Sequence, residues 1–156
     1  MNVSFAHARV NELPEISKFT DFWLSGRGLR VNAPGAVNDC FISPSQHKRY
    51  IVKYNTYLAR FNEVLIGWAV VQTNGSLIHF IIAGTHRGRQ IGSKFLKFIN
   101  PEIIHSKIDQ SSGDPGPFYE KHGYRKIETI NSHSRLDIDK IKPNRKKNID
   151  IYQKII

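Results

Sequence analysis

The chain has 156 residues, of which 40% are hydrophobic and 11% aromatic, a composition typical of a folded globular protein and not of a disordered one. Its charge is strongly positive, because 23 Lys and Arg stand against 13 Asp and Glu and give a formal net charge of +10. No apolar run approaches the ~18 residues that cross a bilayer, and the first ten residues lack the apolar region of a signal peptide. We therefore expect no membrane partner. The single cysteine, Cys40, excludes an internal disulfide framework, which is typical of a reducing compartment, so we expect a cytoplasmic protein.

The first third of the chain is predicted to form two helices separated by a loop. Residues 10–22 carry apolar side chains at helical spacing, with Asn11 as a candidate N-cap. Residues 25–36 are rich in glycine and arginine and contain a proline, which predicts a loop. The polar residues 44–53 are interpreted as a short helix.

Three strands are predicted next. Residues 56–61 and 64–72 flank Asn62-Glu63, a hairpin signal that lacks the favoured Asn-Gly pair. Asn74-Gly75 supplies that pair, and the apolar residues 77–82 form the following strand. The sheet is therefore expected to begin as an antiparallel meander.

The second half of the chain alternates between helix and strand. A helix with one apolar face ends at Asn100-Pro101, and residues 103–108 form a buried strand. The remaining segments are a short helix over 118–122 that ends at Gly123, a strand over 124–130, and further strands or edge segments over 136–141 and 149–156. A meander followed by a strand–helix–strand crossover predicts an α/β fold with a mixed sheet and helices on its faces.

The turn that follows the strand at 77–82 is predicted to bind phosphate. It contains Gly88 and Gly92, which allow close backbone approach, and it leads into a helix whose first N–H groups and dipole favour an anion. Arg87 and Arg89 can donate charge-assisted hydrogen bonds to phosphate oxygens. The glycine spacing fits neither the dinucleotide fingerprint nor the P-loop, so neither nucleotide motif is met. The alternative is a surface turn with solvated arginines.

Two motifs carry a family resemblance. Residues 87–92 read RGRQIG, and residues 118–123 read FYEKHG. In this order they resemble motif A (Q/R-x-x-G-x-G/A) and motif B (FYEK-x-GF) of the GNAT (N-acetyltransferase) superfamily, over residues 56–130. Gln90 stands where the family normally has glycine, so a residue with a Cβ must fit the pyrophosphate turn, and a helical backbone conformation would tolerate it.

The resemblance implies a GNAT-like acyl-CoA N-acyltransferase fold in a single domain over 1–156, with a core over 56–130 and a basic segment over 137–156. It implies that two central strands splay apart, that the pantetheine arm of acetyl-CoA lies between them, and that backbone N–H groups near Ile81 to Ala83 hold the thioester carbonyl. Acetyl-CoA is the expected co-substrate, without a metal. The residues expected to bind it are Ile81, Ile82, Ala83, Arg87, Gly88, Arg89, Gln90, Ile91, Gly92, Ser93, Ser112, Phe118 and Lys121.

The resemblance also suggests catalytic groups. Tyr119 matches the family tyrosine that protonates the leaving CoA thiolate, a role that suits a phenol because it keeps its proton at neutral pH. The alternative is a half-buried helix tyrosine. His79 is the candidate general base, because imidazole titrates in the useful range, although it is equally interpreted as a hydrogen-bonded core histidine. Further candidates for the base are His105, Asp109, Asp114 and an ordered water molecule.

Three functions stay open. The first is acyl transfer from acyl-CoA to an amine of a small molecule or protein. The second is modification of a base or base-attached amine on nucleic acid, with residues 145–147 and other basic residues attracting phosphates and four aromatic residues stacking bases: Tyr50, Tyr54, Tyr57 and Trp68. The third is a non-catalytic binding module. The sequence has no H-x-x-x-H pair, so no metal site is predicted, and it has no G-x-S-x-G elbow, so no hydrolase is predicted. We expect a monomer or homodimer.

Overall fold

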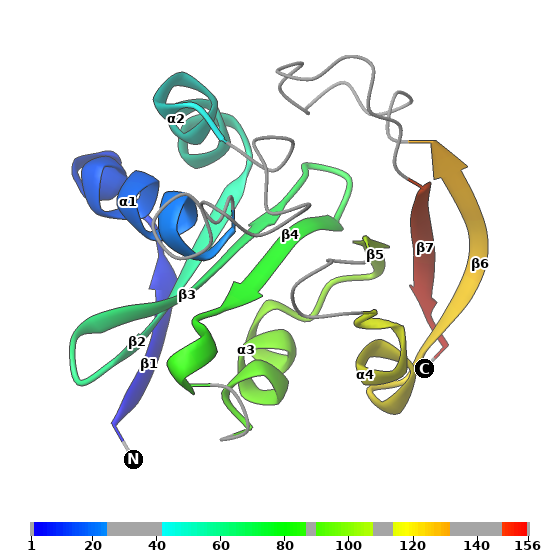
Figure 1. Cartoon of the computed structure of the whole chain (residues 1–156). Coiled ribbons are helices and arrows are strands. Elements are labelled where there is room, and N and C mark those ends of the chain that lie inside the picture. The colour runs from blue at the N-terminus through cyan, green and yellow to red at the C-terminus, as the bar shows by residue number, and fades with distance from the viewer. Residues whose placement is uncertain (1, 25–41, 87–89, 108–113, 132–147, 156) are drawn as a thin grey trace, which may run out of the picture.

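The structure, a computed structural model, describes residues 2–24, 42–86, 90–107, 114–131 and 148–155. These residues form a seven-stranded sheet with the order β1-β2-β3-β4-β5-β7-β6 (Figure 1). The strands are β1 (Val3–His7), β2 (Asn55–Phe61), β3 (Val64–Val71), β4 (Ser76–Ile82), β5 (Ile103–Ser106), β6 (Tyr124–Asn131) and β7 (Asn148–Lys154). The helices are α1 (Leu13–Trp23), α2 (Pro44–Lys53), α3 (Ile91–Ile99) and α4 (Gly116–Lys121), with short 3-10 turns at η1 (Val10–Glu12) and η3 (Gly84–His86).

The sheet is mixed, which confirms the predicted fold class. Neighbouring strands run antiparallel except β4 and β5, which are parallel and are joined by the crossover that carries α3. The last strand, β7, pairs with β5 on one side and with β6 on the other. It therefore lies inside the sheet, between strands that precede it in the sequence.

The predicted hairpins form, and their turns show why. Asn62 and Glu63 both adopt left-handed backbone conformations, with φ of 49° and 71°. Two consecutive residues with positive φ give the turn whose twist matches that of the flanking strands, so the β2–β3 hairpin closes without an Asn-Gly pair. Gly75, with φ of 87°, closes the next turn at the predicted Asn-Gly position.

The helix over 44–53 also forms as predicted. The Ser43 hydroxyl accepts a hydrogen bond from the Gln46 N–H at 3.1 Å, and Pro44 occupies the first helical position. Both features stabilise a helix start, because they satisfy or remove N–H groups that have no intrahelical acceptor. In the part of the chain that the structure describes, no helix combines the length and apolar character needed to cross a bilayer.

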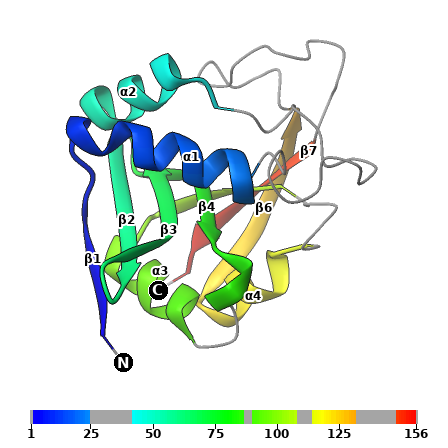
Figure 2. The ribbon, with the colours of Figure 1, turned by 60° about the vertical axis from the view of Figure 1, so that its left-hand side comes forward.

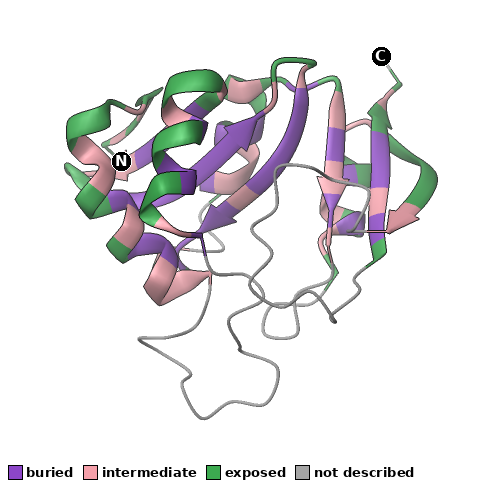
Figure 3. Cartoon of the chain, turned by 90° about the horizontal axis from the view of Figure 1, so that it is seen from above, coloured by how far each residue is buried: buried purple, intermediate pink, exposed green. Residues whose placement is uncertain are grey.

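Helices cover both faces of the sheet, with α1 and α2 on one face and α3 and α4 on the other (Figures 1 and 2). Trp68 of β3 contacts His47 of α2, with ring centroids 5.4 Å apart. Phe80 of β4 points to the opposite face and stacks on Phe95 of α3 at 5.5 Å. Buried side chains therefore line the central strands on both faces (Figure 3), which fixes the position of the helices on either side of β4.

Candidate active site

The central feature of the candidate site is a gap between β4 and β5. These two strands pair only at Ser76 with Ile103 and at Leu77 with Ile104. Beyond that point β4 continues to Ile82 while β5 pairs only with β7, so the two strands diverge (Figure 1). This divergence confirms the predicted splay of the central strands.

An irregularity in β4 coincides with the start of the gap. Val70 of β3 lies opposite His79, whereas the next residue, Val71, lies opposite Leu77. Ile78 is therefore an extra residue in β4, which is the arrangement of a β-bulge. Because a bulge bends its strand and increases the local twist, this residue accounts for the departure of β4 from β5 directly after Leu77.

The backbone of β4 determines which groups line the gap. The Ala83 N–H donates to the Ile66 carbonyl of β3 at 2.7 Å. Since the hydrogen-bonding direction alternates along an antiparallel strand, Ile81 also faces β3, while Phe80 and Ile82 present their backbone groups to the gap. Within the expected range of Ile81 to Ala83, the N–H groups of Ile81 and Ala83 therefore point toward β3, and the backbone of Ile82 is the one that faces the gap.

The α3 helix begins beside this gap, after a residue in an uncommon conformation. Gln90, at the N-cap, has φ of 61° and ψ of 15°, which is the left-handed region. Gln90 therefore does not adopt the helical conformation that would accommodate a Cβ without strain. Glycine reaches this region without a steric cost, which explains why motif A normally carries glycine here.

The first turn of α3 offers N–H groups that make no intrahelical hydrogen bond. Lys94 N–H donates to the Gln90 carbonyl at 3.1 Å, so the N–H groups of Ile91, Gly92 and Ser93 precede the first intrahelical bond. A Cβ on Gly92 would lie 3.5 Å from Phe118 Cζ and 3.9 Å from Ile82 Cγ1, in ordinary contact. The space next to Gly92 therefore lies between α4 and the edge of β4 that faces the gap.

The α4 helix brings Tyr119 to the same face as α3. Tyr119 is 4% exposed and contacts Phe80 of β4 at a centroid distance of 6.5 Å, Phe118 at 5.5 Å and Tyr152 of β7 at 5.8 Å. Its contacts with β4 and β7 place it across the gap, because β7 is the strand next to β5. Burial raises the pKa of the Tyr119 phenol well above its usual range, and the neighbouring Tyr152 and Tyr124 add to the shift.

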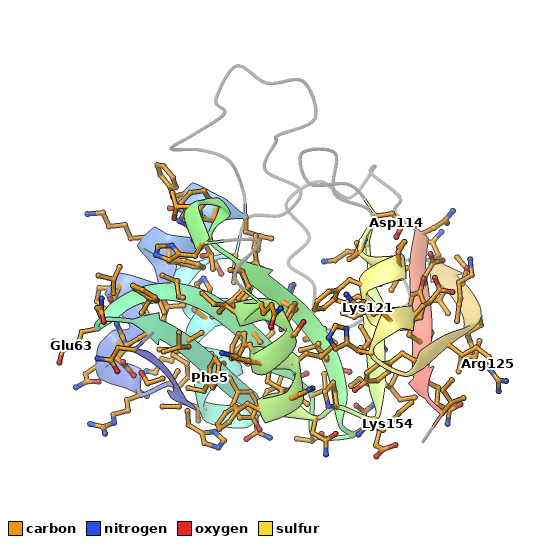
Figure 4. The ribbon with its side chains drawn as sticks, turned by 90° about the horizontal axis from the view of Figure 1, so that it is seen from below. Phe5, Glu63, Asp114, Lys121, Arg125 and Lys154 are labelled. Atoms are coloured by element: carbon orange, nitrogen blue, oxygen red, sulfur yellow. The ribbon has the colours of Figure 1, made fainter. Side chains whose placement is uncertain are left out.

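Close packing holds α4 against β7. A Cβ on Gly116, the first residue of α4, would overlap the Tyr152 hydroxyl, so a larger residue here would force the tyrosine or the helix to shift. Burial raises the pKa of Tyr152, as do the nearby carboxylates of Asp114, Asp150 and Glu120. Asp114 and Lys121 mark the two ends of the helix in Figure 4, and both side chains are exposed.

His79 lies on the opposite face of β4, toward α2. Its Nε2 is 3.0 Å from the Tyr50 hydroxyl, and its ring stacks on Trp68 at a centroid distance of 5.0 Å and an angle of 27°. His79 is 7% exposed, and Tyr50 and Trp68 are fully buried. Tyr119 and His79 therefore lie on opposite faces of the sheet, and His79 contacts β3 and α2.

A second histidine continues this buried cluster. His47 of α2 meets the edge of the Trp68 ring, and its Nε2 lies 2.8 Å from the Thr20 hydroxyl of α1. Sequence reasoning did not predict the contact of Tyr50 with His79 or that of His47 with Trp68, because both contacts depend on how α2 packs. The prediction that Tyr50 and Trp68 stack on nucleic-acid bases is wrong, since neither ring has exposed surface.

Several predicted site residues fall outside the described part of the chain. These are Arg87, Gly88, Arg89, Asp109 and Ser112, together with Cys40 and residues 145–147. Among the described residues, no group of three or more His, Cys, Asp and Glu side chains is placed to hold a metal ion. His105 lies on β5 beside the gap, one residue after the last pair with β4.

Solved structures that are similar to this fold include acetyltransferases. Naa50 of Arabidopsis thaliana, in complex with the bisubstrate analogue CoA-Ac-MVNAL, matches with a TM-score of 0.62 and 16% identity over 97% of this chain and 98% of that chain. A GCN5-related N-acetyltransferase from Rhodopseudomonas palustris matches with a TM-score of 0.72 and 11% identity over 99% and 96%. The ribosomal-protein-alanine N-acetyltransferase of Brucella melitensis gives 0.62 and 14% over 98% and 99%. No curated protein matches the sequence.

A family model described as an acetyltransferase (GNAT) domain matches residues 31–136, which is more than half of the chain. The chain therefore belongs to the GNAT acetyltransferase family, and it is an acyltransferase enzyme.

Proposed function

We propose that this enzyme transfers an acetyl group from acetyl-CoA directly to an amine, with Tyr119 as the general acid. The observation that carries the proposal is the gap between β4 and β5, which Tyr119 spans by contacting Phe80 of β4 and Tyr152 of β7. A direct transfer needs a proton acceptor near the amine and a proton donor near the leaving sulfur. Tyr119 is the proposed donor, and His79, on the other face of β4, is the proposed acceptor.

The residues around the gap suit acetyl-CoA. The backbone of Phe80 faces the gap and can hydrogen-bond an extended amide-containing arm as a neighbouring strand would. The first turn of α3 provides N–H groups and the positive end of a helix dipole for the phosphates. Acetyl-CoA supplies the acyl group as a thioester, and a backbone N–H of β4 is the proposed donor to its carbonyl oxygen, a role typically worth ~3 kcal/mol of transition-state stabilisation.

Tyr119 is proposed to donate its phenolic proton to the departing thiolate sulfur. Its burial keeps the phenol protonated at all physiological pH values, so the donor is always available. Phe80 and Tyr152 confine the ring from the two sides of the gap, which fixes its direction. The phenol recovers its proton from solvent once the products leave.

His79 is proposed to accept the proton that the amine loses on attack. The Tyr50 hydroxyl at 3.0 Å and the stacked Trp68 ring hold the imidazole in one orientation. A base fixed in this way needs no reorganisation during the reaction, which favours proton transfer. Tyr50 belongs to α2, so the packing of α2 on the sheet sets the position of this base.

The acceptor is proposed to be an amine on a small molecule or a protein. A second candidate is an amine on nucleic acid, and one observation favours it: Lys48, Arg49 and Lys53 are all exposed on α2, a helix without acidic residues. A polyanion near this face would gain electrostatic attraction. Comparing oligonucleotide, peptide and small amine acceptors in the presence of acetyl-CoA distinguishes the two.

Acetyl-CoA should bind the parent enzyme and raise its melting temperature. At 100 times the dissociation constant, the ligand adds about 2.7 kcal/mol to the free energy of unfolding. Gly92→Glu should abolish this shift, because the added side chain would enter the space between Phe118 and Ile82 and bring a negative charge to the phosphate site. Differential scanning fluorimetry and calorimetry with acetyl-CoA measure both effects.

Gly92→Ala is the matched control. The Cβ of alanine meets its neighbours at ordinary contact distances, so coenzyme binding should persist. Alanine should also stabilise the helix by roughly 0.5–1 kcal/mol relative to glycine. If millimolar acetyl-CoA gave no heat and no thermal shift with the parent enzyme, the proposed use of acetyl-CoA would be wrong.

His79→Phe should lower the turnover number by about 100-fold or more, which is the usual contribution of a general base. Phenylalanine retains the stack on Trp68, so the loss would come from the missing imidazole. His47→Phe is the control, because His47 touches the same tryptophan but does not lie on β4. The pH dependence of kcat for the parent and both variants is the measurement. A His79→Phe variant with the parent's turnover and pH profile would remove His79 from the mechanism.

A further inference from the structure

His122, which follows α4, links that helix to α3. Its Nδ1 lies 2.8 Å from the Phe118 carbonyl oxygen, and its Nε2 lies 2.9 Å from the Ser93 hydroxyl. A carbonyl oxygen only accepts hydrogen bonds, so Nδ1 carries the proton. In the neutral ring, Nε2 then accepts the Ser93 O–H, and both ring nitrogens are engaged.

The two partners of His122 belong to the two halves of the coenzyme site. Ser93 is the third residue of α3 and lies in the first turn, whose N–H groups are proposed to bind phosphate. Phe118 directly precedes Tyr119, the proposed acid. His122 therefore connects the start of the phosphate-binding helix with the helix that carries the proton donor.

Aromatic packing reinforces this connection. The His122 and Phe118 rings lie 4.5 Å apart, and the Phe118 ring reaches the α-carbon region of Gly92. Phe118 also contacts Phe80 of β4, with ring centroids 6.3 Å apart. The first turn of α3, the α4 helix and the gap-facing edge of β4 thus meet around one phenylalanine, and His122 supplies the polar link among them.

We propose that His122 is a positioning residue of the coenzyme site, which holds the first turn of α3 in the orientation that binds phosphate. This inference rests on the proposed use of acetyl-CoA. A turn that is already fixed before the ligand arrives loses less conformational freedom on binding, and its N–H groups converge without rearrangement. The His122–Ser93 hydrogen bond provides that constraint, because it ties the turn to a helix packed on β7.

Two substitutions separate this role from a purely local one at the end of α4. Asn places its amide nitrogen near the position of Nδ1, so His122→Asn keeps the bond to Phe118 and removes the bond to Ser93. Gln places its amide oxygen near the position of Nε2, so His122→Gln can still accept the Ser93 O–H. Both variants lack the imidazole, which makes them a matched pair.

Binding of CoA, measured by isothermal titration calorimetry, tests the inference without an acceptor substrate. We expect His122→Asn and Ser93→Ala each to weaken CoA binding by about 5- to 10-fold, as expected for the loss of one hydrogen bond. His122→Gln should stay within about two-fold of the parent. The His122→Asn/Ser93→Ala double variant should bind no more weakly than either single variant, because both remove the same interaction.

Other outcomes overturn the inference. Parent-like binding by His122→Asn would show that the Ser93 bond does not shape the site, and additive losses in the double variant would show that the two residues act separately. Equal losses in the Asn and Gln variants would assign the effect to the imidazole ring and not to the link. If the parent itself binds no CoA, the proposed function fails first, so the two failures are distinguishable.

Discussion

Replacing Tyr119 with phenylalanine should lower the turnover number by about 100-fold while leaving the dissociation constant of acetyl-CoA nearly unchanged. The phenylalanine ring fills the same space between Phe80 and Tyr152, so the gap keeps its shape and the coenzyme its contacts. Only the proton donor to the leaving thiolate is lost. Steady-state kinetics and calorimetry on the same preparations separate the two quantities.

The pH dependence of the reaction provides a second test of Tyr119. Because burial raises the pKa of its phenol, the group keeps its proton to higher pH than an exposed tyrosine, whose pKa is near 10. The pH profile of the parent should therefore show no falling limb from this residue up to about pH 10. A falling limb near pH 8 that disappears in Tyr119→Phe would contradict this assignment.

Tyr124→Phe is the matched control for Tyr119→Phe. Tyr124 is also buried, and burial raises its pKa to about 12, but its hydroxyl donates to the Pro101 carbonyl at 2.6 Å. Its loss should cost about 1 kcal/mol of stability, which is typical of a buried hydrogen bond, and should leave turnover within two-fold of the parent. Unaltered turnover in Tyr119→Phe would remove that residue from the mechanism.

Local patterns in the sequence predicted most of the described elements. The β2–β3 and β3–β4 hairpins follow from apolar runs that turn signals interrupt, and α2 has the predicted bounds because Ser43 and Pro44 define its start. The strand β1 was not predicted. Its five residues, Val3–His7, are too short for a clear pattern, and they become a strand by pairing with the edge of β2.

Tertiary features of the site could not be predicted in the same way. The splay between β4 and β5 was an implication of the family resemblance, but its local cause, the extra residue Ile78, depends on the register with β3. Motif B identified Tyr119 and left His122 unassigned, since its role depends on a serine in another helix. The pairing of His79 with Tyr50 likewise joins residues that only the packing of α2 brings together.

Trp68→Ala should produce a large loss of stability, about 3–5 kcal/mol, the usual range for deleting a buried aromatic side chain. The indole is fully buried between α2 and the sheet. Its centroid lies 5.0 Å from that of His79, 5.4 Å from that of His47 and 6.5 Å from that of Tyr50. Removing it would leave a cavity lined by polar rings. Chemical denaturation, with the midpoint and slope fitted separately, measures the loss.

Trp68→Phe should cost much less, about 1–2 kcal/mol, because it keeps an aromatic ring between the two imidazoles. The indole N–H has no hydrogen-bond acceptor among the residues that the structure describes, so phenylalanine sacrifices volume and no hydrogen bond there. Since the stacked ring also positions His79, the alanine variant should lose turnover at temperatures where it remains folded, whereas the phenylalanine variant should keep most of it. Equal stability losses in the two variants would show that the ring contacts around Trp68 contribute little.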